Sequence, residues 1–253
     1  MPRFTLIATV ALSALAATTA CAQDGPRGAA FEPVEDIAWS YRAASGPESK
    51  AMLRFTRDGM NATFDPRDVP EIFDALAASP GQPGETVAFS LAREAGALAC
   101  SGRTTEEGRA AGTCRFDPDQ RFIAGLASRG LPAEDVGQVL GLTLVDAKLT
   151  SVDDLSRECV RVEDADQLMA VSALGVTPAF VVELRQAGLA ASDMDDLIAA
   201  RALEIDAAWV EAMAEAGYPG LGIEKAIQMR ALGVTPDYAR RMARVRRATE
   251  GTE

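Results

Sequence analysis

The chain has 253 residues, and 37 Asp and Glu against 25 Lys and Arg give it a formal net charge of −12 at pH 7. A surface this acidic repels phosphate backbones, so we expect no nucleic-acid partner. The sequence contains no histidine, which excludes Ser-His and Cys-His nucleophile activation and removes the commonest zinc ligand. The content of 48% hydrophobic and 25% charged residues is typical of a globular protein.

Residues 1–22 have the pattern of a secretory signal peptide: Arg3 is the only charge, an apolar stretch follows, and an A-x-A cleavage site ends the segment. The apolar stretch is shorter than the ~20 residues of a membrane-spanning helix. The sequence therefore predicts an exported, periplasmic protein cleaved after Ala22. The alternative is a lipid-anchored envelope protein, because the segment before Cys21 resembles a bacterial lipobox, although Thr18 replaces the expected leucine. A membrane contact is expected only through acylation of Cys21.

Residues 23–118 are predicted to form an antiparallel β-rich module. Asp58-Gly59 is a two-residue hairpin signal. The register that it favours pairs Arg57 with Met60, Phe55 with Ala62 and Leu53 with Phe64. Alternating apolar residues predict two more strands, at Ile37, Trp39 and Tyr41 and at Val87, Phe89 and Leu91, and a short helix follows Pro70 with Ile72, Phe73 and Leu76.

A second hairpin is expected from Leu98 to Phe116, with its turn near residues 107–108. This register places Cys100 opposite Cys114, and in an oxidising compartment the pair suits a cross-strand disulfide. Two buried free thiols are the alternative. Cys159 is left over and is expected to be a small core residue.

The hexapeptide ALGVTP occurs at residues 173–178 and again at 231–236, and residues 202–207 form a third version midway between them. The three starting positions define a 29-residue period. The same period relates an aromatic column: Phe180, Trp209 and Tyr238. Packing between neighbouring units is the expected role of this column, and a ligand-stacking groove is the alternative.

Each unit has the capping and turn residues of two helices joined by a tight turn. The turn residues are Gly175 and Gly233 as left-handed helix ends, Thr177, Asp206 and Thr235 as N-caps, and Pro178 and Pro236 at the first helical position. Glu204 occupies the glycine column in the middle unit, so that turn either closes differently or tolerates strain. Further helix ends are expected at Gly188 and Gly217, and capping boxes at Ser192 with Asp195 and at Ser151 with Asp154.

Residues 119–253 are therefore predicted to form an α-helical repeat domain, in which three units and a degenerate one at residues 136–155 stack around a shared core. In the degenerate unit, Val145-Asp146 resembles Val176-Thr177. The expected fold class is α+β: a small antiparallel β module followed by α-helical hairpin repeats.

The GVTP turns, the strand FSLAREAGAL and the CRFDPD segment after the second hairpin resemble uncharacterised exported bacterial proteins. They are also similar to the extracytoplasmic tails of some antirepressor-type membrane metallopeptidases of beta-lactamase regulatory systems. The resemblance covers residues 86–247. It implies no activity, and the H-E-x-x-H motif of those peptidases is absent here.

These features favour a non-enzymatic protein-interaction module that binds another protein through stacked helical hairpins. An envelope-anchored accessory component of a stress or antibiotic-response signalling system is the alternative. We expect no cofactor and no metal. The paired carboxylates Asp153 with Asp154 and Asp195 with Asp196 lie at predicted helix starts, where acidic residues favour the helix dipole, so we expect them to be structural rather than catalytic.

Overall fold

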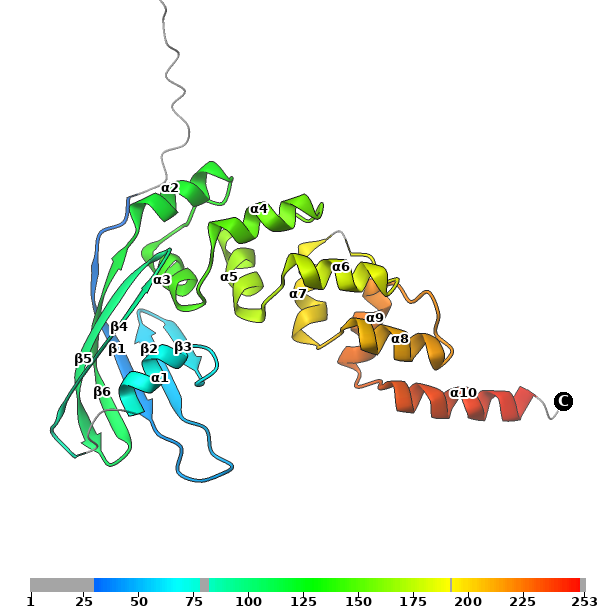
Figure 1. The fold of residues 1–253 in the computed structure, drawn as a ribbon, viewed down its shortest axis with the longest axis horizontal. Coiled ribbons are helices and arrows are strands. Elements are labelled where there is room, and N and C mark those ends of the chain that lie inside the picture. Colours follow the sequence, from blue (N-terminus) through cyan, green and yellow to red (C-terminus); the bar gives the residue numbers. More distant parts are fainter. Residues whose placement is uncertain (1–29, 78–81, 192, 251–253) are drawn as a thin grey trace, which may run out of the picture.

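A computed structural model describes residues 30–77, 82–191 and 193–250, without the side chains of residues 245–250. The predicted signal peptide, Cys21 and Ser192 lie outside the described residues. The protein forms a sheet module, and a row of paired helices extends from it as an arm (Figure 1). This arrangement confirms the expected α+β fold, with a β module followed by helical repeats.

The sheet contains β1 (Val34–Arg42), β2 (Met52–Arg57), β3 (Met60–Phe64), β4 (Thr86–Arg93), β5 (Gly96–Glu106) and β6 (Arg109–Pro118). Their order is β3-β2-β1-β6-β5-β4, and every neighbouring pair is antiparallel. Helix α1 (Pro70–Ala77) packs on β4 and buries Ile72, Phe73 and Leu76. The three apolar residues share one face of the helix, as their spacing predicts.

Both predicted hairpins are confirmed, including their registers. Across the β2–β3 turn, Arg57 pairs with Met60 and Leu53 with Phe64. In the β5–β6 hairpin, Cys100 pairs with Cys114 and the two residues form a disulfide with a Cα–Cα distance of 4.0 Å. The bridge lies in the sheet interior, where both cysteines are buried.

The arm consists of α2 (Gln120–Ser128), α3 (Val136–Leu144), α4 (Leu149–Arg157), α5 (Ala165–Leu174), α6 (Pro178–Gln186), α7 (Met194–Ala202), α8 (Ala207–Glu215), α9 (Ile223–Ala231) and α10 (Pro236–Glu250). The even-numbered helices begin at residues 120, 149, 178, 207 and 236, and the odd-numbered ones at 136, 165, 194 and 223, so both series keep the period of the sequence repeat without a shift. The repeat therefore starts half a unit earlier than expected, with α2. Phe122 of this helix belongs to the aromatic column, two periods before Phe180.

The helices form two layers. In the first layer α3 packs on α5, α5 on α7 and α7 on α9, and in the second α6 packs on α8 and α8 on α10. Phe180 and Trp209 are buried between units. A single apolar core continues from the sheet into the repeats, because α3 also packs on β5 and β6.

The turn between the two helices of a unit has one backbone geometry throughout. Its left-handed residue is Asp146 (φ 55°), Gly175 (φ 69°), Glu204 (φ 55°) or Gly233 (φ 73°). The strained alternative for Glu204 is therefore the observed one. The alignment of Val145-Asp146 with Val176-Thr177 is wrong, because Asp146 occupies the column of Gly175.

The residue two positions after each left-handed turn residue precedes the next helix. Thr177 and Thr235 accept a hydrogen bond from the backbone N–H three residues later, both at 3.2 Å, and Asp206 accepts one at 2.7 Å. Pro178 and Pro236 are the first residues of α6 and α10. In the first unit this position is Lys148, which makes no side-chain cap.

Three smaller expectations are wrong. Ser151 lies inside α4, so it does not cap the helix. The cap of α7 is Asp193, whose carboxylate accepts from the Asp195 N–H at 2.8 Å. Cys159 is an exposed turn residue with φ 61°, because it occupies the column of Gly188 and Gly217, the left-handed residues that end α6 and α8.

Candidate functional site

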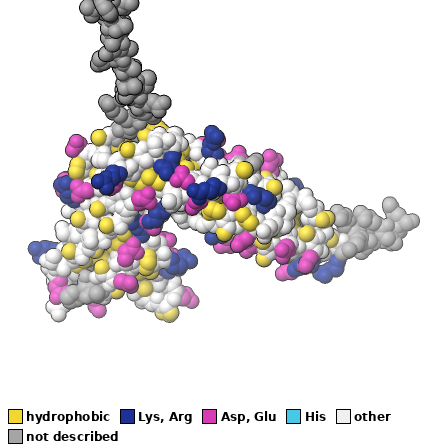
Figure 2. Space-filling view, turned by 45° about the horizontal axis from the view of Figure 1, so that its top comes forward, with side chains coloured by type: hydrophobic (Ala, Val, Ile, Leu, Met, Phe, Trp, Pro, Cys, Tyr) yellow, Lys and Arg dark blue, Asp and Glu magenta, His cyan; other side chains and the backbone are white. Residues whose placement is uncertain are grey.

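The sheet module and the helical arm meet at an angle, which leaves a notch between them (Figure 2). Two hollows lie in this notch, with volumes of about 580 Å³ and about 1030 Å³. Their walls come from the β2–β3 turn or the loop before α1 on one side. On the other side they come from the odd-numbered helices and the segments next to them, with Trp209 of α8 at the second hollow. The odd-numbered layer is therefore the side of the arm that faces the notch.

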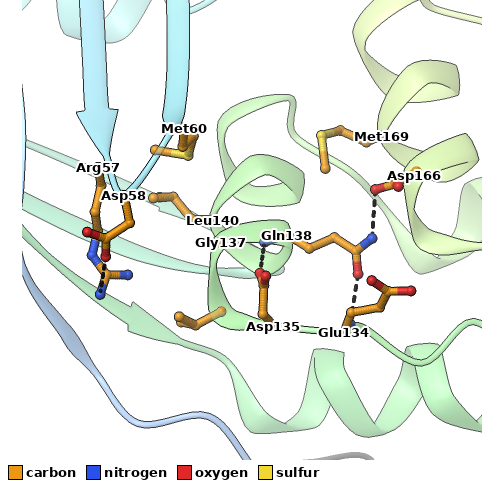
Figure 3. A pocket seen from close by; sticks show the side chains of 11 residues that line it. Arg57, Asp58, Met60, Glu134, Asp135, Gly137, Gln138, Leu140, Asp166 and Met169 are labelled. Atoms are coloured by element: carbon orange, nitrogen blue, oxygen red, sulfur yellow. Dashed lines mark hydrogen bonds and ion pairs between the residues drawn. The ribbon is translucent and has the colours of Figure 1, made fainter.

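The first hollow lies between the β2–β3 turn and the N-terminal ends of α3 and α5 (Figure 3). Asp135 caps α3 by accepting from the Gln138 N–H at 2.8 Å. The Gln138 side chain accepts from the Glu134 N–H at 2.9 Å and donates to the Asp166 carboxylate at 2.6 Å. Gln138 thus holds the starts of two neighbouring helices in one fixed arrangement.

This hollow is acidic and contains two methionines. Its charged residues are Asp58, Glu134, Asp135 and Asp166, with Arg57 as the cation. Arg57 lies 3.3 Å from the Asp58 carboxylate, so its charge is already paired. Met60, the first residue of β3, and Met169 of α5 lie on opposite walls (Figure 3). Methionine is flexible and polarizable, and it is common on surfaces that adapt to a bound protein segment.

The second hollow lies between the loop before α1 and the C-terminal ends of α5 and α7, with the turn that follows α7. Arg201 donates from Nε to the Leu174 carbonyl at 3.0 Å, and its guanidinium lies 5.1 Å from the ring centre of Phe180. Arg230 donates in the same way to the Leu203 carbonyl at 2.8 Å. Each arginine satisfies a carbonyl at the end of the preceding odd-numbered helix and so joins successive units.

Trp209 also borders the second hollow. Its side chain is buried, and within the described structure its indole N–H has no hydrogen-bond acceptor. Buried donors are nearly always paired in folded proteins. The aromatic column therefore has an unused donor at the wall of the notch.

Helix α5 connects the two hollows. Asp166 and Met169 border the first, and Ala173 and Leu174 border the second. Residues 166, 169 and 173 are spaced as one face of a helix. The two hollows therefore follow one face of α5, and an extended segment or a helix lying along it would contact both.

The residues predicted from the sequence have different places relative to the notch. Asp206 and Trp209 border the second hollow, and Phe180 lies beneath Arg201. Gly175, Thr177 and Pro178 form the turn after α5, and Gly233, Thr235, Pro236 and Tyr238 belong to the last unit. Cys100 and Cys114 lie in the sheet interior. The first hollow does not follow from the sequence patterns described above. One signal for it is that Gln138, which fixes its wall, recurs one period later as Gln167.

Within the described residues, no three carboxylate or thiol groups are placed to hold a metal ion. No single described helix is long and apolar enough to cross a membrane. Helices α5 and α6 reach that length and apolar content only when taken together, and the angle between them is 73°. Comparisons with protein-family models, with curated proteins and with solved structures found no match for this chain.

Proposed function

We propose that the chain is a non-enzymatic, exported protein-interaction module that holds a segment of another protein in the notch. The observation that carries the proposal is the first hollow, where flexible Met60 and Met169 face each other between walls held by Gln138. A rigid frame with adaptable apolar side chains suits recognition of a protein segment.

The carboxylates of the hollow have structural roles that support a non-enzymatic reading. Asp135 caps α3, and Asp166 accepts the hydrogen bond that joins α3 to α5. Both side chains are thus used to hold helix ends in place.

Site-specific photo-crosslinking in the exporting cell tests this function. A photoreactive residue at Met60 or Met169 should give a discrete protein adduct. The matched control is Gln186, an exposed residue of α6 in the other layer of the arm, which should give none. Equal labelling from both layers, or no adduct from either methionine, would refute the notch as a protein-binding site.

The identity of the adduct also decides between the two roles. A membrane sensor peptidase at Met169 would support an accessory role in an envelope stress or antibiotic-response system, which the resemblance to peptidase tails favours. A different stable protein would support a general scaffold.

Export is part of the same proposal, and the Cys100–Cys114 disulfide is compatible with an oxidising compartment. If Cys21 is acylated, the chain should partition with membranes and Cys21→Ser should release it. A lipid-free mature chain that begins at Gln23 would instead support cleavage after Ala22 and a periplasmic protein.

A further inference from the structure

The last unit of the arm exposes two apolar residues, Tyr238 and Met242, whose equivalents in the two preceding units are buried. In the aromatic column, Phe180 is 5% and Trp209 7% exposed, whereas Tyr238 is 46% exposed. In a second column Met213 is fully buried and Met242 is 46% exposed. Natural repeat arrays usually end in a unit with a polar outer face. This array, as far as the described residues extend, does not.

The turn of the last unit is open in the same way. The Leu174 and Leu203 carbonyls each receive an arginine from the following unit, at 3.0 Å and 2.8 Å. Leu232 occupies the next position of this column, and its side chain is 82% exposed, against 36% for Leu174. We call the surface formed by Leu232, Tyr238 and Met242 the end face.

Helix α10, which carries Tyr238 and Met242 of the end face, is rich in arginine. Helix α10 contains five arginines, at positions 240, 241, 244, 246 and 247, against Asp237 and Glu250. Arg240 is paired with Asp237 at 2.6 Å, and Arg241 and Arg244 are exposed. A basic helix with apolar residues is thus present in a chain whose net charge is −12.

We propose that the end face of one copy docks into the first hollow of a second copy. The hollow offers what the end face lacks: the carboxylates of Asp58, Glu134 and Asp166 for the arginines, and Met60 and Met169 for the apolar residues. Complementary charge of this kind sets orientation and register. The inference rests on the proposed function, because it names an occupant for the same hollow.

The arrangement in space requires a second copy. The hollow lies beside the β2–β3 turn, and α10 lies at the far end of the arm (Figure 1). The stacked helices between them are held by one continuous core, so α10 cannot fold back into its own hollow.

Two other pairings between copies are disfavoured. End face against end face would bring two arginine-rich helices together, and like charges at an interface are costly. Continued stacking of the odd-numbered layer onto another arm is blocked, because α3 already packs on β5 and β6. The remaining contact is head to tail, which gives a ring where the rotation closes and an open chain where it does not.

Sedimentation velocity of the purified mature chain tests the proposal. Association should increase with protein concentration and weaken as salt screens the charges. A variant with Arg241→Glu and Arg244→Glu should raise the dissociation constant about tenfold or more. A second variant, Asp58→Arg with Glu134→Arg, should have the same effect from the other side of the contact.

Mixing the two variants is the decisive experiment. The reversed end face of the first variant complements the reversed hollow of the second, and the unchanged surfaces complement each other as well, so the mixture should associate although neither variant does alone. Arg121→Glu with Arg161→Glu, at two exposed positions that do not line the first hollow and do not belong to α10, is the matched charge control and should associate like wild type. Circular dichroism melts establish that all variants are folded.

Three results would overturn the inference: a wild-type chain that stays monomeric up to its solubility limit at low salt, association that the charge variants leave unchanged, or a mixture that fails to associate. Binding of the monomeric chain to phosphatidylglycerol vesicles through α10 would assign the end face to a lipid surface instead. A monomeric chain whose Met169 still crosslinks another protein would refute this inference and leave the proposed function intact.

Discussion

Gln167 donates a hydrogen bond from Nε2 to the Asp195 carboxylate of the next unit, at 2.8 Å. Gln138 makes the same bond to Asp166, one period earlier, at 2.6 Å. These two bonds form a ladder along the odd-numbered helices. One period after Gln167, the position of the glutamine is occupied by Asp196. One period after Asp195, the position of the accepting aspartate is occupied by Glu224, which is close enough to Asp196 to raise its pKa. The ladder therefore ends in two carboxylates.

Replacing Asp196 with glutamine should continue the ladder, because the amide can donate to Glu224. We expect Asp196→Gln to raise the free energy of unfolding by about 0.5–1.5 kcal/mol, the usual net value of one hydrogen bond. Urea unfolding measures this change. Glu211→Gln removes one negative charge from an exposed position of α8 and serves as the control. Equal stabilisation by both substitutions would attribute the effect to net charge rather than to the ladder.

The same residue predicts a pH dependence. Burial raises the pKa of Asp196 above its usual 3.8, and the neighbouring carboxylates Asp193, Glu224 and Asp195 raise it further. The folded chain then holds this proton more tightly than the unfolded chain. The protonated Asp196 side chain therefore contributes its full stabilisation below pH 3.8, and this stabilisation is lost as the pH rises through the raised pKa.

Asp196→Asn should accordingly be more stable than wild type at neutral pH, with the difference shrinking as the pH falls toward 3.8. Urea unfolding of both proteins across this range gives the difference directly, and other titrating groups cancel in the comparison. A difference that grows toward low pH would contradict the assigned sign.

Glu204 has φ 55° in a turn where two of the other units use glycine. A left-handed conformation costs a non-glycine residue about 1–2 kcal/mol, and the greater freedom of glycine in the unfolded chain offsets part of the gain. We expect Glu204→Gly to stabilise the chain by about 0.5 kcal/mol. The 3.5 Å ion pair of Glu204 with Arg230 is mostly exposed and should subtract little. Thermal melts that show destabilisation would refute the strain argument.

The reverse substitution tests the last unit. Gly233 has φ 73°, and no atom lies within 4 Å of the position that a Cβ would occupy, so Gly233→Val probes the backbone alone. We expect a loss of about 1–2 kcal/mol or more, since valine is β-branched. Thr235→Ala, which removes the cap on the Tyr238 N–H, should cost about 1 kcal/mol. A Gly233→Val variant with the same melting temperature as wild type would show that ALGVTP does not recur because of the left-handed turn and the cap.

Thiol labelling tests the disulfide. Cys159 is exposed and should react with iodoacetamide in the native, unreduced mature chain. Cys100 and Cys114 should react only after reduction and denaturation. In the chain-entropy model, a bridge that closes a loop of this size contributes about 3 kcal/mol. Labelling of all three thiols in the denatured but unreduced chain would refute the bridge.

Features that depend on neighbours in the chain could be predicted from the sequence. The β2–β3 register follows from Asp58-Gly59, because a two-residue turn leaves one pairing that keeps the apolar residues together. The repeat period follows from the recurring turn, because each helix end needs its own left-handed residue and cap. Cys100 and Cys114 could be paired for the same local reason, since they share one hairpin.

Three features differ from what local residue type suggests. Cysteine is often buried, yet Cys159 occupies an exposed turn position that contains glycine in later units. Val145-Asp146 looks like Val176-Thr177, but the 29-residue period places Asp146 in the column of Gly175. Helix α2 belongs to the repeat, and its signal in the sequence is Phe122, which lies in the aromatic column.

The local signals in the sequence determined the β module, the helical units and the disulfide pair. Only the tertiary structure decided that β1 lies between β2 and β6, that the arm meets the sheet at a notch, and that Tyr238 and Met242 of the last unit are half exposed. The first hollow joins Met60 to Met169, which are far apart in the chain and related by no turn or period. Turn chemistry and periodicity act over a few residues or one repeat, whereas the angle between two packed modules depends on side chains from both of them at once.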